Sequence, residues 1–233
     1  MSSIETRIQK TREHILEVAT KCGRSDEVQL LAVSKTKPAA MIREAWTGGQ
    51  RAFGENYVQE SVDKIQELSD LEGIEWHFIG PIQSNKSRLV AENFNWVHSV
   101  DRLKIARRLS EQLPDGKAPI NICLQVNIDN EPTKSGFSAS EVLAAAQEVI
   151  ALKGVKLRGL MAIPAPSENK AQQKRPFKAI RALMDQLKAA HPEQQLDTLS
   201  MGTTADLDAA IEEGATIVRI GTALFGARDY SNK

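Results

Sequence analysis

Short apolar runs alternate with longer amphipathic segments along most of this 233-residue chain. The short runs end at Gly, Pro or polar residues, which is typical of buried strands. The longer segments repeat their apolar residues every three or four positions, which predicts helices that bury one face. The strand-like runs are residues 30–35, 51–55, 75–80, 95–100, 120–128, 156–163, 196–202 and 216–221.

Helix boundary signals accompany the amphipathic segments. Ser2 and Glu5 predict a capping box for a first helix, which Gly23 ends. Asp101 is a predicted N-cap for a later helix. Further helices are expected from near Pro38, over 57–68, 87–92, 101–113, from a capping box of Ser138 and Glu141 to about 151, over 172–190 and over 205–214.

Strands that alternate with helices pair in parallel, because parallel neighbours need a crossover connection. Eight such units predict a single α/β domain over residues 1–233, a (β/α)8 TIM barrel, with residues 1–23 as an extra N-terminal helix packed outside it. A doubly wound open sheet is the alternative, but no Gly-x-Gly-x-x-Gly follows the first strand. No linker rich in Pro, Gly or Ser divides the chain.

Composition narrows the class of protein. The 30 Lys and Arg residues balance 30 Asp and Glu residues, which gives no electrostatic footprint for nucleic acid or an anionic membrane. Cys22 and Cys123 have no metal-ligand spacing and cannot form a disulfide framework. The charged N-terminus has no signal-peptide core, and no apolar run is long enough to span a bilayer. We therefore expect a cytoplasmic protein without a metal site.

Two lysines follow the first strand, and their positions separate them. Function gathers at the carboxyl ends of barrel strands. Lys35 follows the apolar run directly, where partial desolvation favours the neutral amine that condenses with a carbonyl. Lys37 precedes Pro38, so it belongs to an exposed loop. The alternative for Lys35 is an amine that reaches solvent or pairs with a carboxylate.

Two loops near the end of the chain suit a phosphate. Small and hydroxyl residues follow strands seven and eight, where (β/α)8 barrels commonly bind phosphate through free backbone N–H groups. Ordinary capping by Ser and Thr is the alternative for each stretch alone. The residues are Ser200, Gly202, Thr203 and Thr204 in one loop, and Gly221 and Thr222 in the other.

Arg219 lies at the end of the last strand. Together these features fit pyridoxal 5′-phosphate (PLP), with an aldehyde for the amine of Lys35, a phosphate for the loops and a pyridine nitrogen for Arg219. Arginine donates to that nitrogen without protonating it, so the ring stays a weaker electron sink. A structural Arg219 paired with Asp206 or Asp229 is the alternative. His77 is expected to be a packed or hydrogen-bonded strand residue.

Seven segments between residues 30 and 230 resemble the pyridoxal phosphate homeostasis protein family. The resemblance implies a barrel of PLP fold type III, like the N-terminal domain of alanine racemase. It also implies a Schiff base on Lys35 and an Arg219 that faces the pyridine nitrogen. The segments are "LLAVSKTKP", "FGENYVQE", "EWHFIGPIQSNK", "KSGF", "RGLMAIP", "LSMG" and "VRIGTALFGARDY".

The same resemblance implies the surroundings of the cofactor. Asn56 and Met161 line the pocket near the ring, and the phosphate is held by the loops of Ser200, Gly202, Gly221 and Thr222. The chain departs from the family in one place. Members usually continue "SMG" with Met-Ser, whereas this chain has Thr203 and Thr204. A hydroxyl remains at that turn, and its role as a phosphate donor is an expectation.

The resemblance further implies a carrier of PLP that keeps vitamin B6 and amino-acid pools in balance, without a settled catalytic reaction. An alanine racemase takes a second catalytic base from an additional domain. We do not expect such a domain here, and only Tyr57 and Tyr230 could supply that base from this chain. A PLP-dependent amino-acid enzyme, such as a weak racemase, is one alternative. A cofactor-free barrel, with Lys35 in an aldolase-type Schiff base, is another. We expect a monomer that passes PLP to apo-enzymes.

Overall fold

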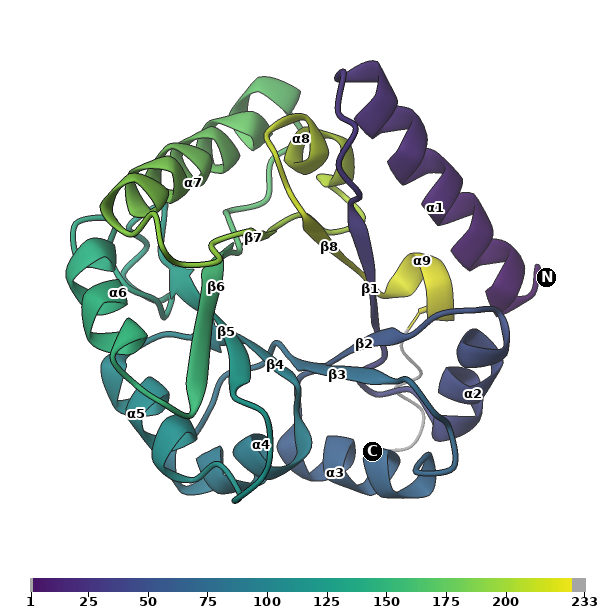
Figure 1. Ribbon diagram of the computed structural model, residues 1–233. Helices are drawn as coiled ribbons and strands as arrows, with labels where there is room; N and C mark the ends of the chain where they lie inside the picture. Colours follow the sequence, from purple (N-terminus) through teal and green to yellow (C-terminus); the bar gives the residue numbers. More distant parts are fainter. Residues whose placement is uncertain (1, 228–233) are drawn as a thin grey trace.

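Eight parallel strands close into a barrel in sequence order (Figure 1). The structure is a computed structural model, and it describes residues 2–227. β1 pairs with both β2 and β8, which closes the sheet and confirms the predicted (β/α)8 barrel over the open doubly wound alternative. The strands are β1 (Gln29–Val33), β2 (Ala52–Glu55), β3 (Glu75–Phe78), β4 (Trp96–Val100), β5 (Ile120–Val126), β6 (Val155–Ala162), β7 (Thr198–Ser200) and β8 (Ile217–Ile220).

Helices surround the barrel and bury their apolar faces against the outer side of the strands (Figure 1). Ile42, Ile105, Leu109 and Phe177 are fully buried in this layer. The helices are α1 (Ile4–Lys21), α2 (Ala39–Thr47), α3 (Val58–Glu67), the 3-10 turn η1 (Ser84–Lys86), α4 (Ser87–Asn93), α5 (Leu103–Glu111), α6 (Val142–Ile150), α7 (Lys170–Ala190), α8 (Leu207–Glu212) and α9 (Thr222–Phe225).

Two predicted helix caps were wrong by one residue. Ser3, rather than Ser2, caps α1, because its backbone is extended and its hydroxyl accepts the N–H of Thr6. Asp101 does not cap α5, because its carboxylate accepts from the side chain of Arg102, which itself occupies the cap position.

The third predicted cap, at Ser138, forms only in part. The carboxylate of Glu141 accepts the backbone N–H of Ser138 at 2.8 Å, which is one half of the capping box. The hydroxyl of Ser138 also donates to that carboxylate, instead of accepting a backbone N–H from the first turn of the helix. The regular helix α6 therefore begins only at Val142.

The first helix is a member of the outer ring. The helix after β8, α9, has only four residues, and α1 contacts α9 and both neighbours on either side, α2 and α8 (Figure 1). One face of α1 is buried there, including Ile8 and Ile15. The N-terminal helix thus covers the gap that a short last helix leaves between β8 and β1.

The barrel interior is partly polar. Side chains alternate between the two faces of each strand, and those that face inward can meet across the barrel. His98 on β4 reaches Ser200 on β7, although β5 and β6 lie between these strands. His77, His98 and Ser200 are fully buried, and Arg219 is 6% exposed. The apolar residues that form separate interior groups are Leu31, Ala52 and Ile217, and Trp96, Cys123 and Met161.

Among the described residues, no helix has both the length and the apolar character that a bilayer crossing requires.

Ile8→Ala tests the role of α1. Ile8 is fully buried on α1, so the substitution leaves a cavity and lowers the free energy of unfolding by about 2–5 kcal/mol. Leu16→Ala on the same helix is the matched control, because Leu16 is 67% exposed and its truncation changes stability by less than about 0.5 kcal/mol. Urea unfolding followed by circular dichroism measures both. Equal losses in the two variants would contradict a docked α1.

Candidate functional site

Lys35 lies on a tight turn at the carboxyl end of β1. The turn closes with a hydrogen bond from the N–H of Lys37 to the carbonyl of Ser34, at 3.0 Å. Thr36 adopts a positive φ of 62°, a conformation that side chains other than glycine rarely take. Lys35 is half-buried and has the same parity along β1 as the inward-facing Leu31. The strand therefore places Lys35 at the barrel mouth.

Lys37 follows two residues later and is half-buried, as Lys35 is, rather than fully exposed as predicted. Its ammonium donates to the backbone carbonyl of Ala227 at 2.6 Å, so it ties the first βα loop to the end of the described chain. This contact gives Lys37 a structural role that differs from the position of Lys35 at the mouth.

Charged groups on β2 and α3 hold the turn in place. The hydroxyl of Ser34 donates to Oε1 of Glu55 at 2.6 Å. The ammonium of Lys64 donates to the carbonyl of Ser34 at 2.9 Å, and the N–H of Thr36 donates to Oε1 of Glu60 at 2.6 Å. Both ends of the strained turn are therefore anchored from outside the barrel.

Lys64 joins these anchors into one buried network. Its three ammonium hydrogens are matched by three acceptors, the carbonyl of Ser34 and the carboxylates of Glu55 and Glu60. Glu55 is fully buried, and burial raises the pKa of its carboxyl group against the opposing effect of Lys64. The sequence placed Glu55 at the end of the second strand. In the structure its side chain faces Lys64 on α3. The spacing of Glu60 and Lys64, four residues apart on a helix, was the available signal for this network.

Unused backbone N–H groups gather at the loops after β7 and β8. Within the described part of the chain, the N–H groups of Gly202, Gly221 and Thr222 donate to no acceptor. Gly202 has a φ of 94°, and a Cβ there would lie 2.5 Å from the Cβ of Ala210. A Cβ on Gly221 would lie 3.2 Å from the carbonyl of Val33. Gly202 thus lets its loop pack against α8, and Gly221 lets its loop lie against the end of β1.

The hydroxyl residues of the first loop are differently placed. Both the N–H and the hydroxyl of Thr203 donate to Oδ1 of Asp206, at 2.6 and 2.8 Å. The hydroxyl of Ser200 lies inside the barrel, beside Arg219 and His98. Backbone N–H groups, rather than these two hydroxyls, are therefore the donors that this structure leaves for a phosphate.

Arg219 is buried beneath the mouth and donates to neutral acceptors. Nη1 donates to the carbonyl and the hydroxyl of Ser200 at 2.6 and 2.8 Å, and Nη2 donates to the carbonyl of Ala162 at 3.0 Å. Burial lowers its pKa to about 10, so the guanidinium keeps its charge at neutral pH. Asp206 accepts from Thr203 instead of forming an ion pair with Arg219, and Asp229 lies outside the described residues.

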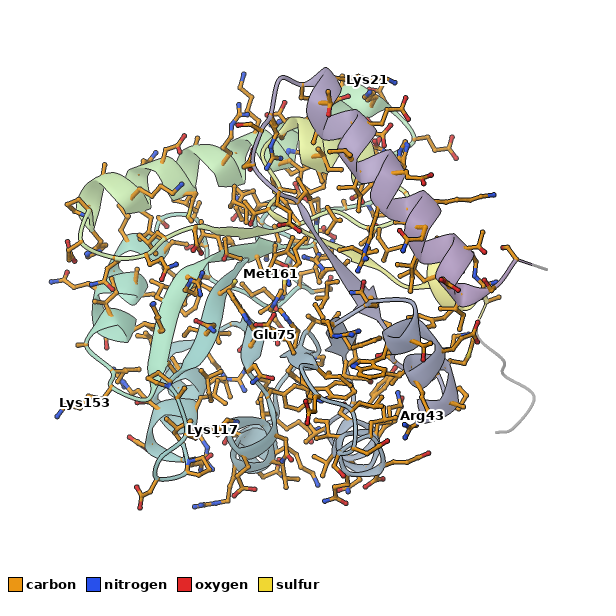
Figure 2. All side chains as sticks on the ribbon, turned by 45° about the vertical axis from the view of Figure 1, so that its right-hand side comes forward. Lys21, Arg43, Glu75, Lys117, Lys153 and Met161 are labelled. Atoms are coloured by element: carbon orange, nitrogen blue, oxygen red, sulfur yellow. The ribbon has the colours of Figure 1, made fainter. Side chains whose placement is uncertain are left out.

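Asn56 and Met161 occupy different levels of the barrel. Oδ1 of Asn56 is buried without a partner among the described residues, so a bound ligand that donates to it would satisfy it. Asn56 also borders a cavity of about 310 Å³ at the barrel mouth, together with Ile79 and Asn127. Met161 is fully buried against Trp96 and Cys123, and Figure 2 shows it near the middle of the molecule. Met161 thus lies below the mouth.

The residues present suit PLP, the cofactor that the sequence predicts. A lysine, two loops with unused N–H groups, a buried cation and an unsatisfied amide oxygen meet at one end of the barrel. A phosphate, an aldehyde and a ring nitrogen require donors and an amine of this kind. Among residues 2–227, no three His, Cys, Asp or Glu side chains gather as a possible metal site.

His98 and His77, the latter predicted to be a packed or hydrogen-bonded strand residue, are hydrogen-bonded in the barrel interior. His98 Nδ1 lies 2.7 Å from the hydroxyl of Ser200, and His98 Nε2 lies 2.9 Å from Nδ1 of His77. His77 Nε2 lies 3.0 Å from Oε2 of Glu75. Burial lowers the pKa of both histidines, that of His98 well below its ordinary value. Both rings are therefore neutral at pH 7.

Comparisons with known proteins give a consistent family. The alanine racemase N-terminal domain family matches residues 7–229. A curated relative from Pseudomonas aeruginosa, named pyridoxal phosphate homeostasis protein, is 57% identical over 99% of this chain and 98% of its own length. One of the same name from Escherichia coli K12 is 52% identical over the full length of both chains.

Solved structures agree with this family. PipY of Synechococcus elongatus, solved without PLP, superposes with a TM-score of 0.87 at 40% identity, covering 96% of this chain and all of that one. The same protein solved with PLP bound gives a TM-score of 0.86 at 38% identity, again over 96% of this chain and all of PipY. Alanine racemase from Corynebacterium glutamicum, at 16% identity and a TM-score of 0.66, shares the fold over 96% of this chain and 63% of its own.

Lys64→Met tests the network behind the Lys35 turn. The substitution leaves Glu55 buried without its cation and lowers the free energy of unfolding by about 3–5 kcal/mol. Lys21→Met is the matched control, because Lys21 has the same four-residue spacing to Glu17 but is exposed, and it leaves stability unchanged. Urea unfolding measures both. Similar behaviour of the two variants would show that the buried network does not hold the turn.

Stability should fall as the pH is lowered from 7 to 5. Burial lowers the pKa of both histidines in the folded protein, so the unfolded chain, where the ordinary pKa is 6.5, takes up these protons first as the pH falls. Each therefore contributes a slope of up to about 1.4 kcal/mol per pH unit below that value, with stability lost toward acid. Urea unfolding at pH 7, 6 and 5 measures the slope. His98→Gln removes one such group and should give a shallower slope, and an unchanged slope would contradict the assignment.

Proposed function

This chain belongs to the pyridoxal phosphate homeostasis protein family, and we propose that it holds PLP as a Schiff base on Lys35 and acts in the balance of intracellular vitamin B6 and amino acids. The observation that carries the proposal is the meeting, at one barrel mouth, of the Lys35 turn with the unused N–H groups of Gly202, Gly221 and Thr222. PipY, which shares this fold along its whole length, has been solved with PLP bound.

Each residue has a distinct part in this proposal. The amine of Lys35 condenses with the aldehyde of the cofactor and releases water. The N–H groups of Gly202, Gly221 and Thr222 hold the phosphate. Arg219 donates to the pyridine nitrogen, and Asn56 lies beside the ring, with Met161 beneath it. Thr203 supports the phosphate loop through Asp206.

A carrier accounts for this site better than a catalyst of carbanion chemistry. PLP serves such reactions as an electron sink, which is strongest when its ring nitrogen is protonated. Arg219 keeps its proton at neutral pH and does not transfer it, so the ring nitrogen stays unprotonated. Tyr57, a candidate for a second base, is 49% exposed, and Tyr230 lies outside the described residues.

The proposal extends to the setting of the protein. We infer a cytoplasmic monomer, a single cofactor-binding domain over residues 1–233, that delivers PLP to apo-enzymes. Cys22 and Cys123 are both free thiols, which agrees with a reducing compartment. The name shared by the curated relatives supports the homeostasis role.

Absorption spectroscopy of the purified protein with added PLP tests the proposal. The wild type should show a visible band that borohydride bleaches, with the cofactor then retained covalently and seen by mass spectrometry. Lys35→Ala should lose the band and the covalent product, because the amine that forms the Schiff base is removed. Lys37→Ala is the matched control and should keep both, because the ammonium of Lys37 is hydrogen-bonded to the carbonyl of Ala227.

Three outcomes separate the alternatives. A protein that stays colourless with PLP and is trapped by borohydride only with a sugar phosphate would establish the cofactor-free aldolase-type barrel. Turnover of an added amino acid, followed by chiral chromatography, would establish the PLP-dependent enzyme. A band that persists in Lys35→Ala would overturn the Schiff-base assignment.

A further inference from the structure

A line of polar side chains crosses the barrel interior. The inside of a (β/α)8 barrel is normally filled by bulky apolar side chains, and a buried polar group is costly unless it is hydrogen-bonded. Here Glu75 and His77 on β3, His98 on β4, Ser200 on β7 and Arg219 on β8 form a continuous series of hydrogen bonds. Each link is between 2.7 and 3.0 Å.

The hydrogens in this line can point in only one direction. Glu75 is a carboxylate and only accepts, so His77 donates to it from Nε2. A neutral ring carries one hydrogen, so Nδ1 of His77 accepts from Nε2 of His98. Nδ1 of His98 then accepts the single hydrogen of the Ser200 hydroxyl. Nη1 of Arg219, which can only donate, supplies the hydrogen bond that this hydroxyl accepts.

The line runs from one end of the barrel to the other. Glu75 is the first residue of β3, at the end opposite the mouth, and its side chain is 43% exposed. Ser200 is the last residue of β7, and Arg219 lies near the end of β8. Trp96 stacks on His77, with ring centroids 5.4 Å apart, and donates to the same carboxylate of Glu75. The anion at the base thus fixes the direction of the chain, and the cation at the mouth is compatible with it.

The direction has two consequences for the mouth. The one hydrogen of the Ser200 hydroxyl is used by His98, so this hydroxyl has none to donate to a phosphate. Three of the five N–H groups of Arg219 donate to Ser200 and Ala162 within the described part of the chain. The remaining N–H groups of Arg219, on Nε and Nη2, are the ones left for a ligand.

We propose that Ser200, His98, His77 and Glu75 form a one-way hydrogen-bond chain that orients Arg219 toward the ring nitrogen of PLP. Ser200 and His98 are positioning residues for the ring end of the cofactor, and the Ser200 hydroxyl does not hold the phosphate. This inference rests on the proposed function for its ligand, whereas the direction of the chain belongs to the protein alone.

Nitrogen-15 NMR of the imidazoles tests the direction without cofactor. Both His77 and His98 should give the signature of a neutral ring with the hydrogen on Nε2, assigned with His77→Gln and His98→Gln. Arg219→Met alone should keep that signature, because Glu75 still imposes the direction. Adding Glu75→Gln removes both terminal charges and should give mixed tautomers. An Nδ1–H tautomer or a protonated ring in the wild type would overturn the chain.

Ligand comparison tests the positioning role. PLP and pyridoxal, which lacks the phosphate, are titrated into the wild type, Ser200→Ala, His98→Leu and the double variant. Each single variant should weaken both ligands by the same factor, roughly tenfold, because Arg219 loses part of its support. The double variant should be no weaker than the worse single variant, because both substitutions break one chain. Ser200→Thr, which keeps the hydroxyl, should restore binding.

The other outcomes are also decisive. A Ser200→Ala variant that loses PLP affinity but keeps pyridoxal affinity would show that Ser200 holds the phosphate, and would overturn the proposal. Unchanged affinity for both ligands would overturn it as well. A wild type that binds neither ligand would refute the proposed function, while the NMR result would still decide the direction of the chain.

Discussion

Pairing between the first and the last strand is the constraint on which this site depends. β1 and β8 lie in parallel register, with Leu31 opposite Arg219 and Ala32 opposite Ile220. This register brings the turn that carries Lys35 beside Gly221, although 186 positions separate them in the 233-residue chain. Parallel strands end at the same edge of a sheet, so the amine, the loop donors and the guanidinium meet without any long loop to position them.

The buried charges that this constraint gathers are stabilised by hydrogen bonds. A buried ion is costly unless acceptors or donors replace its water. Arg219 has carbonyls and a hydroxyl for this purpose, and Lys64 has three acceptors for three hydrogens. One network stiffens the Lys35 turn from the outside of the barrel, and the other reaches Arg219 from the inside. The mouth between them is formed by groups that have little freedom to move.

Sequence reasoning found the elements that depend on local pattern. Apolar runs bounded by breakers located the strands, and the position of Pro38 separated Lys37 from Lys35. It missed the contacts that closure creates. Ser200 and His98 are 102 residues apart in the sequence. The alternation of side chains along a strand shows which residues of that strand share a face, but not which residues of another strand they meet. Lys64 sits four residues after Glu60 on an amphipathic helix, a pattern that usually indicates a solvated pair. Only the packing of α3 against β2 buries it.

The helix caps illustrate a smaller limit of the same kind. Ser2 and Ser3 are adjacent and chemically identical, and the choice between them depends on where the backbone leaves the extended conformation. That point is set by the docking of α1 on α2 and α8. Local chemistry therefore predicts that a cap exists, and tertiary packing decides which residue provides it.

The place of α1 in the outer ring has a consequence for biosynthesis. The helix that completes the ring is made first, whereas the strand that closes the barrel, β8, is made last. At a synthesis rate of about 5–20 residues per second, roughly 10–40 s pass between the emergence of β1 and that of its partner β8. During that interval α1 lacks its contacts with α8 and α9, and one edge of β1 is unpaired. The ribosome-bound chain therefore exposes surfaces that chaperones recognise until nearly its whole length has emerged.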